Sequence, residues 1–179
     1  RLESEDGKFV GLPVGDMDSI AETYDISDLE DRRSAPKFRH KIKFLGSLRD
    51  YQEPAVRAMV KAGSGVLEAP PRSGKTVMGT DLCIRIGKKT LIMAAQQDWL
   101  DQFYETFCGG DMMDAITNIP ELEKKLGYRI CGMAKTKEDF ETLDIALTTY
   151  QMFMEVYGKK KLSWIKRKFG TLIVDECLR

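Results

Sequence analysis

Short apolar strand candidates alternate with helix candidates from Leu48 onward, and this alternation constrains the fold more than any other feature of the sequence. Each strand candidate is bounded by Gly, Pro, Lys or Asp and is apolar enough to be buried on both faces. The strand candidates are residues 65–69, 90–95, 128–133, 144–148 and 171–174. The helix candidates are residues 51–62, 75–86, 98–107 and 151–157, and we expect Asp98 to cap the third of them. The alternation predicts an α/β domain with a parallel sheet flanked by helices.

Residues 1–46 differ from the rest of the chain in composition and in the pattern of their charges. An acidic stretch runs from Glu3 to Asp31, and a basic run follows from Arg32 to Lys43. We expect residues 1–46 to be a short N-terminal extension or the tail of a preceding domain, and residues 47–179 to form the main domain. Residue 1 is Arg rather than Met, so we expect the native start to lie upstream.

The charge balance and hydropathy of the chain restrict the classes of partner that it can bind. It has 28 Lys and Arg residues and 28 Asp and Glu residues, so no global field draws it onto nucleic acid or an anionic membrane, and any polyanion must be held locally. No window approaches the roughly 18 apolar residues of a membrane span, and no signal segment opens the chain. We therefore expect no membrane partner and a cytoplasmic location, in the host cell if the protein is viral.

The four cysteines and the single histidine argue against two kinds of chemistry. Cys83, Cys108, Cys131 and Cys177 are widely spaced, which disfavours a zinc site and favours reduced, partly buried thiols. His40 lies inside the basic run, and we expect it to face solvent. Because the chain has a single histidine, nucleophilic catalysis by a Ser-His-Asp or Cys-His arrangement is disfavoured.

Residues 69–76, Ala-Pro-Pro-Arg-Ser-Gly-Lys-Thr, fit a phosphate-binding loop between a strand and a helix, except that Ala69 stands where the first glycine usually stands. Successive backbone N–H groups in such a loop form an anion nest, and the N-terminus of the following helix adds positive charge. Lys75 would neutralise the β- and γ-phosphates, and Thr76 would place its hydroxyl on Mg²⁺. The candidate nucleotide-binding residues here are Pro71, Arg72, Ser73, Gly74, Lys75 and Thr76. A glycine-containing turn on an exposed helix is the alternative.

A second motif, residues 171–177, places two carboxylates directly after a buried strand. Asp175 would hold Mg²⁺, directly or through water, and Glu176 would polarise an attacking water. A strand that simply runs into solvent is the alternative, but a phosphate loop about 100 residues upstream favours the metal role. The candidate catalytic residues are Lys75, Asp175 and Glu176.

The phosphate loop and the Asp-Glu-Cys-x-Arg sequence together resemble the first RecA-like domain of superfamily 2 helicases and translocases, a P-loop NTPase fold. Residues 48–52, Leu-Arg-Asp-Tyr-Gln, resemble the adenine-recognition motif of that family, which implies that Arg49 and Gln52 bind the nucleotide and that Gln52 pairs with the adenine edge. Residues 90–96 and 146–151 resemble the two motifs that contact the nucleic-acid backbone. The residues that this implies as nucleic-acid contacts are Gln96, Gln97, Thr148 and Thr149.

The resemblance has departures. Ala95 stands where the backbone-contacting motif often has Pro, and Leu178 stands where many relatives have the His that links hydrolysis to movement. The second RecA-like domain of the family, which supplies arginine fingers, has no counterpart in residues 48–179, and we expect it as a partner outside this segment. Trp99 is expected either in the core or as a stacking platform for a base, and Phe44 is a candidate for stacking on adenine. The basic stretch 159–168 is expected either to be a solvated helix or to attract a polyanion.

The resemblance implies the N-terminal motor half of an ATP-dependent DNA helicase or translocase, with ATP and Mg²⁺ as cofactors. The expected partner is single- or double-stranded DNA, with RNA as the alternative. Two other classes remain open: a non-catalytic nucleic-acid-binding or partner-docking module with a vestigial nucleotide site, and a phosphotransferase that uses the same loop.

Overall fold

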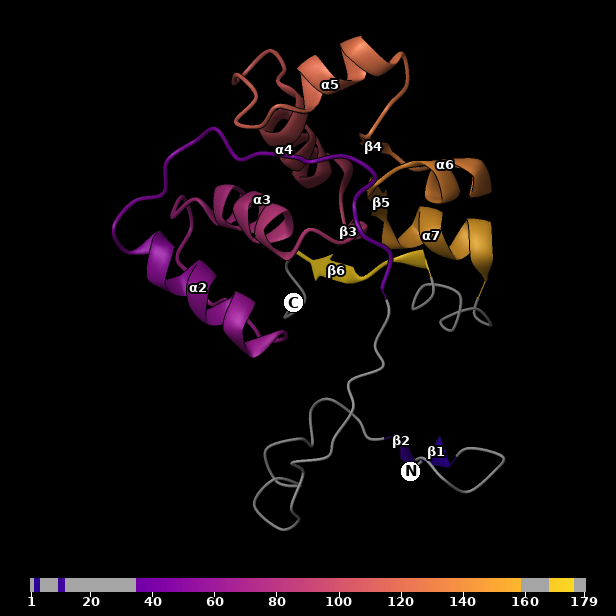
Figure 1. Ribbon diagram of the computed structural model, residues 1–179, viewed down its shortest axis with the longest axis horizontal. Coiled ribbons are helices and arrows are strands. Elements are labelled where there is room, and N and C mark those ends of the chain that lie inside the picture. The colour runs from indigo at the N-terminus through magenta and orange to yellow at the C-terminus, as the bar shows by residue number, and fades with distance from the viewer. Residues whose placement is uncertain (1, 4–9, 12–34, 159–167, 176–179) are drawn as a thin grey trace. The chain divides into compact units, whose positions relative to one another are not determined.

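The computed structural model describes residues 2–3, 10–11, 35–158 and 168–175 of the 179-residue chain (Figure 1). The chain divides into two compact units, Arg1–Arg33 and Ser34–Arg179. In the first unit, strand β1 (Leu2–Glu3) pairs antiparallel with strand β2 (Val10–Gly11). The second unit contains the sheet that carries the candidate site.

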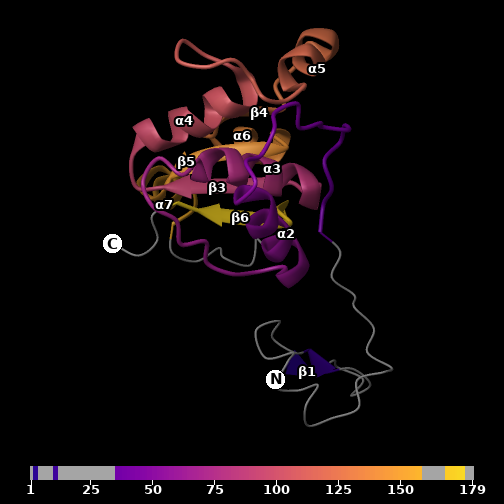
Figure 2. The same ribbon diagram turned by 90° about the vertical axis from the view of Figure 1, so that its left-hand side faces the viewer.

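The second unit is built on a parallel sheet of four strands in the order β4-β5-β3-β6. The strands are β3 (Thr90–Ala94), β4 (Cys131–Met133), β5 (Ile145–Thr149) and β6 (Thr171–Val174). Thr90 lies opposite Ile145 on one side and Thr171 on the other, so β3, β5 and β6 start in register. Because these strands are parallel, they also end at one edge, and the arrows of β3 and β6 point to the same side of the molecule in Figure 2.

Helices cover both faces of the sheet. They are α2 (Gln52–Ala62), α3 (Lys75–Ile86), α4 (Gln97–Cys108), α5 (Ile119–Leu126), α6 (Lys137–Thr142) and α7 (Tyr150–Tyr157). On one face Ile92 packs with Phe103 and Phe107 of α4, and on the other Leu91 packs with Phe140 of α6 and Phe153 of α7. Neighbouring residues of β3 thus enter opposite cores, and each large buried side chain contributes about 1.5–3 kcal/mol. The predicted fold class, an α/β domain with a parallel sheet flanked by helices, is confirmed.

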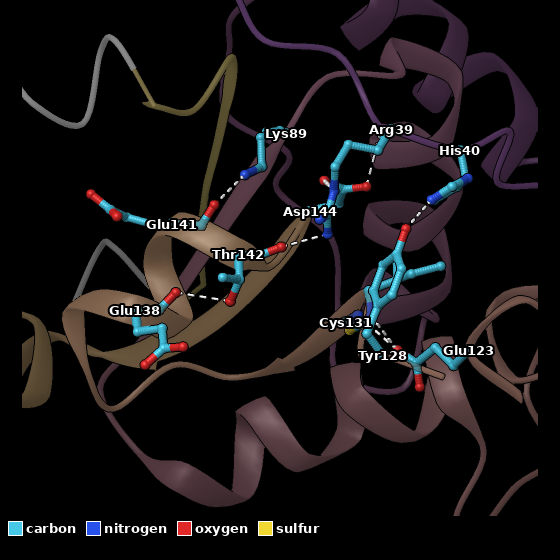
Figure 3. Close-up of polar contacts among 11 residues, drawn as sticks. Arg39, His40, Lys89, Glu123, Tyr128, Cys131, Glu138, Glu141, Thr142 and Asp144 are labelled. Atoms are coloured by element: carbon cyan, nitrogen blue, oxygen red, sulfur yellow. Dashed lines mark hydrogen bonds and ion pairs between the residues drawn. The ribbon is translucent and has the colours of Figure 1, made fainter. Parts of the chain in front are cut away.

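A strap of residues 35–46 crosses the edge of the sheet where the strands begin. Its backbone forms isolated bridges from Lys37 to Lys88 and from Phe44 to Thr117. Asp144 is completely buried, and it accepts hydrogen bonds from the backbone N–H of Arg39 (3.0 Å) and from the Arg39 Nε atom (2.9 Å), as Figure 3 shows. A buried carboxylate requires such partners, so this ion pair fixes the strap to the sheet. His40, the next residue, is only partly exposed and hydrogen-bonds the hydroxyl of Tyr128.

The predicted strand at residues 65–69 is wrong, because the structure places these residues in a segment without strand pairing. The chain leaves α2 through Gly63, which has φ +71°, and Val66 is then 67% exposed. A short, mostly apolar segment does not by itself provide a strand with a ladder partner, and β6 pairs in this structure with β3. The other four predicted strands are present.

Three further boundaries differ from the sequence prediction. Asp98 does not cap α4: the helix begins at Gln97, Gln96 is its N-cap, and no side chain bonds to the cap. The strand predicted at residues 128–133 is reduced to β4 because Glu123 Oε1 accepts the backbone N–H groups of Ile130 (2.6 Å) and Cys131 (3.0 Å). Helices α5 and α6 were not predicted, although Thr136 and Asp139 form a capping box at the start of α6.

Two absences can be stated for the described part of the chain. No helix there combines the length and apolar character needed to cross a bilayer. No group of three or more His, Cys, Asp or Glu side chains there has the arrangement of a metal site.

Cys83, Cys108 and Cys131 are free thiols, and burial raises the pKa of Cys83 to about 12. Cys177 lies outside the described residues.

Candidate nucleotide site

The loop that leads into α3 has the backbone shape of an anion nest. Arg72 has φ +62° and Gly74 has φ +82°, so two left-handed residues bracket Ser73. The Ser73 N–H donates to the Pro70 carbonyl (3.3 Å), and the Met78 N–H donates to the Gly74 carbonyl (3.0 Å), which starts α3. Turns of this kind direct successive N–H groups into one concavity, at a helix terminus whose dipole favours an anion.

Lys75 lies over this loop. Its Nζ atom donates to the carbonyls of Ala69 (3.0 Å) and Pro70 (3.2 Å), both of which belong to the loop. Charged phosphate oxygens are stronger acceptors of an ammonium hydrogen bond than neutral carbonyls. The ammonium is therefore held beside the nest by contacts that a phosphate can replace.

The other loop residues divide between the surface and the interior. Pro71 and Arg72 are exposed, and Thr76 is partly buried. Ser73 is buried, and its Oγ atom has no hydrogen-bond partner among the described residues. A buried hydroxyl without a partner is costly, and a ligand oxygen at this position would satisfy it.

The predicted adenine motif lies directly against the loop. Gln52 is 3% exposed; its Nε2 atom donates to the Ser73 carbonyl (2.8 Å), and its Oε1 atom accepts the backbone N–H of Arg49 (2.8 Å). The structure thus brings Arg49 and Gln52 together with the loop, although they precede it by about twenty residues. Tyr51, which the sequence analysis did not single out, also donates to the Ser73 carbonyl (3.0 Å).

Asp175 follows β6 at the same edge of the sheet. Its backbone N–H donates to the Met93 carbonyl (2.9 Å), and its carbonyl accepts from the Tyr150 hydroxyl (3.3 Å). A connection of three residues joins α3 to β3, so the start of α3, with Lys75, lies toward the edge where the parallel strands end (Figure 2). The structure therefore places the loop and Asp175 at one edge. Glu176 and Leu178 lie outside the described residues.

An ion-pair network holds α2 on α3. Glu53 of α2 bonds Arg85 of α3 through both carboxylate oxygens (2.9 and 2.6 Å) and also bonds Arg57 (2.6 Å). These hydrogen bonds lower the pKa of Glu53 to about 2. Burial raises the pKa of Asp81, and Arg85, 2.7 Å away, opposes that effect. The helix that carries Gln52 is thus joined to the helix that begins at Lys75.

A hollow of about 40 Å³, lined by both polar and apolar side chains, lies beyond the ends of β4 and β5. Its lining includes Gln97, Thr148 and Thr149, three of the four predicted nucleic-acid contacts, together with Lys135. The Thr149 hydroxyl accepts the backbone N–H of Met152 (3.2 Å) and caps α7. Gln96, the fourth predicted contact, is exposed at the start of α4 and is not part of the lining.

The sequence analysis did not identify Lys135 as a candidate nucleic-acid contact. Its position just after β4 was the one signal that could have indicated it. Trp99 packs against the core cluster, which supports its reading as a core residue. Phe44 pairs with Thr117 in the segment before α5. In the basic stretch 159–168, only Lys168 is described, and it forms an ion pair with Glu141 (3.6 Å).

The parallel sheet flanked by helices, with the phosphate-loop sequence before α3, is consistent with a RecA-like domain. Residues 45–179 match the family described as "Type III restriction enzyme, res subunit" (ResIII). The chain belongs to this ResIII family, and the resemblance to ATP-binding superfamily 2 DNA helicases is confirmed.

Two curated relatives are similar to this chain. The first is "General transcription and DNA repair factor IIH helicase/translocase subunit XPB" of Drosophila melanogaster, 24% identical over 162 residues, which are 83% of this chain and 18% of the relative. The second is "Putative DNA 3'-5' helicase Rad25" of Haloarcula marismortui, 41% identical over 104 residues, which are 52% of this chain and 16% of the relative. The chain therefore spans less than a fifth of the length of either protein.

Proposed function

We propose that this chain is the ATP-binding half of a DNA helicase or translocase motor, with the triphosphate held by residues 71–76. The observation that carries the proposal is the loop itself: two left-handed residues shape a nest at the start of α3, with the Lys75 ammonium beside it. The partnerless Ser73 hydroxyl supports a ligand there. Arg49 and Gln52 are proposed to hold the base, since Gln52 bonds the Ser73 carbonyl of the loop and the Arg49 backbone N–H bonds Gln52.

The proposed magnesium ligands are Thr76 and Asp175. Both are oxygen donors, which Mg²⁺ prefers, and both belong to the edge where the loop lies. Bound Mg²⁺ supplies positive charge that offsets the charge developing on the β- and γ-phosphates. Glu176, the residue after Asp175, is proposed to orient the water that attacks the γ-phosphate.

The proposed nucleic-acid contacts are Gln96, Gln97, Thr148 and Thr149. The hollow supports this assignment because it brings together polar groups from the ends of β4 and β5 and the start of α4, and Lys135 adds a cation suited to phosphate. Such contacts do not read the base sequence, as a motor that moves along any sequence requires. DNA is the proposed substrate because the named relatives are DNA helicases.

The division into residues 1–46 and 47–179 stays a prediction, as does the need for a second RecA-like domain. The isolated chain is proposed to bind ATP weakly and to hydrolyse it slowly, because the partner domain supplies the other half of the cleft. A non-catalytic module with a vestigial nucleotide site is the competing function.

A titration with a fluorescent ATP analogue in the presence of Mg²⁺ tests the proposal. The wild-type chain should bind, and Lys75→Ala should lose most of the affinity because the phosphates lose their nearest cation. Lys125→Ala, an exposed lysine of α5, is the matched control and should bind like wild type. Equal binding by wild type and Lys75→Ala, or no binding by wild type, would exclude the proposed site.

A further inference from the structure

The hydroxyl of Tyr51 lies between Arg49 and the phosphate loop, and the proposed function gives it no role. It accepts a hydrogen bond from Arg49 Nη1 (3.0 Å) and donates to the Ser73 carbonyl (3.0 Å). The Tyr51 residue itself is 52% exposed, so burial of its ring does not explain its placement. What fixes this side chain is the pair of hydrogen bonds at its hydroxyl.

The Ser73 carbonyl is held from two directions. It accepts from Tyr51 Oη and from Gln52 Nε2 (2.8 Å), which together can satisfy both lone pairs of the oxygen. In a trans peptide the C=O and the following N–H point in opposite directions, and the described residues contain no cis peptide. Holding the Ser73 carbonyl toward α2 therefore directs the Gly74 N–H away from α2.

The direction of this peptide sets the shape of the nest. Gly74 has φ +82°, and a Cβ atom at this position would lie 2.5 Å from Gln52 Nε2. The loop peptide thus lies close against Gln52 on one side, and Tyr51 bonds the same carbonyl. A carbonyl free to rotate would turn the Gly74 N–H with it and remove a donor from the anion site.

We propose that Tyr51 is a positioning residue for the phosphate loop: its hydroxyl holds the Ser73 carbonyl so that the loop amides face the triphosphate. The proposal rests on the proposed function, because it assumes that the loop binds phosphates. Tyr51 acts through the loop, so it affects the phosphate part of the ligand and leaves the base unaffected. The alternative is that the exposed tyrosine contacts the adenine directly.

Comparison of two ligands separates these roles. The affinities of wild type and Tyr51→Phe are measured by calorimetry for Mg²⁺·ATP and for Mg²⁺·tripolyphosphate, which has no base. Loss of one hydrogen bond should weaken binding of both ligands by the same factor, about two- to tenfold. Tyr128→Phe is the matched control, because it also removes a hydrogen-bonded hydroxyl, at the strap, and should leave both affinities unchanged.

Each other outcome overturns the proposal. Weakened binding of ATP alone would place the hydroxyl on the base, and unchanged binding of both ligands would leave it without a role. Thermal unfolding of the same variant should match wild type, so that any loss of affinity reflects the site and not the fold. Failure of the wild-type chain to bind either ligand would instead contradict the proposed function.

Discussion

At Gly74 two steric demands coincide. The residue has φ +82°, a conformation in which an L side chain costs about 1–2 kcal/mol, and Gln52 leaves no space for a Cβ atom. The same residue contributes a backbone N–H to the proposed nest. Glycine at this position thus serves both the packing of the adenine motif and the approach of a phosphate.

Gly74→Ala is expected to weaken Mg²⁺·ATP binding at least tenfold, because the added Cβ displaces Gln52 or the Ser73 peptide. Gly127→Ala is the matched control: Gly127 also has positive φ (+74°), but nothing lies within 4 Å of its added Cβ. Both variants should lose about 1–2 kcal/mol of unfolding free energy from the positive φ, the clash with Gln52 should add to the loss in Gly74→Ala, and only Gly74→Ala should lose affinity. Calorimetric titration and urea unfolding measure the two quantities, and equal ATP affinities in both variants would argue against this account of the loop.

At the scale of elements, α2 and α3 act as a unit. The ion pair between Glu53 and Arg85 connects the two helices, and the Gln52 amide connects α2 to the loop before α3. A change in the position of α2 would therefore move the loop. The ion pair between these helices requires a charged Glu53, so its contribution to stability depends on pH.

The pKa of Glu53 is lowered to about 2 by Arg85 and Arg57, below its ordinary value of 4.5. A carboxyl group with a depressed folded-state pKa contributes stability above its unfolded pKa and loses that contribution as the pH falls through the folded pKa. Glu53→Gln is thus expected to lower the unfolding temperature between pH 8 and 5.5, with the difference from wild type shrinking as the pH falls below about 4.5.

Thermal unfolding of wild type and Glu53→Gln across this pH range measures the effect. Glu68→Gln, at an exposed loop position, is the control and should differ little from wild type at any pH. A difference between wild type and Glu53→Gln that stays constant down to pH 3 would show that the effect of the substitution does not come from the charge.

Elements with both an apolar pattern and an end signal were predictable from the sequence. Helix α3 runs over Lys75–Ile86 and is closed by Gly87 with φ +67°, and β6 runs over Thr171–Val174, as the pattern indicated. Segment 65–69 has the pattern of a strand, but strand formation depends on a neighbouring strand that a local window does not contain. Helices α5 and α6 have only eight and six residues, too few turns for an apolar repeat to be recognised in the sequence.

The site was predictable in part for a related reason. The loop is local in sequence, and its spacing alone indicates phosphate binding. The hydrogen bonds from Tyr51 and Gln52 to Ser73 join residues about twenty positions apart, and the hollow collects side chains from three separate segments. Contacts of this kind depend on the tertiary fold, so neither Tyr51 nor Lys135 stood out in the sequence.

At the scale of the whole second unit, the two edges of the sheet differ in role. The edge where the strands end carries the phosphate loop, Asp175 and the hollow. The edge where they begin carries the strap, with the fully buried Asp144 bonded by Arg39. The first edge carries the residues that are proposed to bind the nucleotide, and the second carries the ion pair that stabilises the fold.

Arg39→Ala is expected to destabilise the chain by about 3 kcal/mol, because it leaves the Asp144 carboxylate buried with only the backbone N–H of residue 39 as a described partner. Affinity for Mg²⁺·ATP should stay at the wild-type value, since the strap lies at the opposite edge. Lys41→Ala, at an exposed strap position, is the control and should leave the unfolding free energy nearly unchanged. Loss of ATP affinity in a folded Arg39→Ala chain would contradict the separation of the two edges.

The central claim is that one edge of this sheet binds a magnesium triphosphate between the loop and Asp175. A crystal structure of the chain with Mg²⁺ and a non-hydrolysable ATP analogue tests it most directly. The account predicts phosphates on backbone N–H groups of residues 72–76, the Lys75 ammonium moved from the Ala69 and Pro70 carbonyls onto phosphate oxygens, and the metal between Thr76 and Asp175. Phosphates bound elsewhere, or a metal with neither residue among its direct or water-mediated ligands, would contradict it.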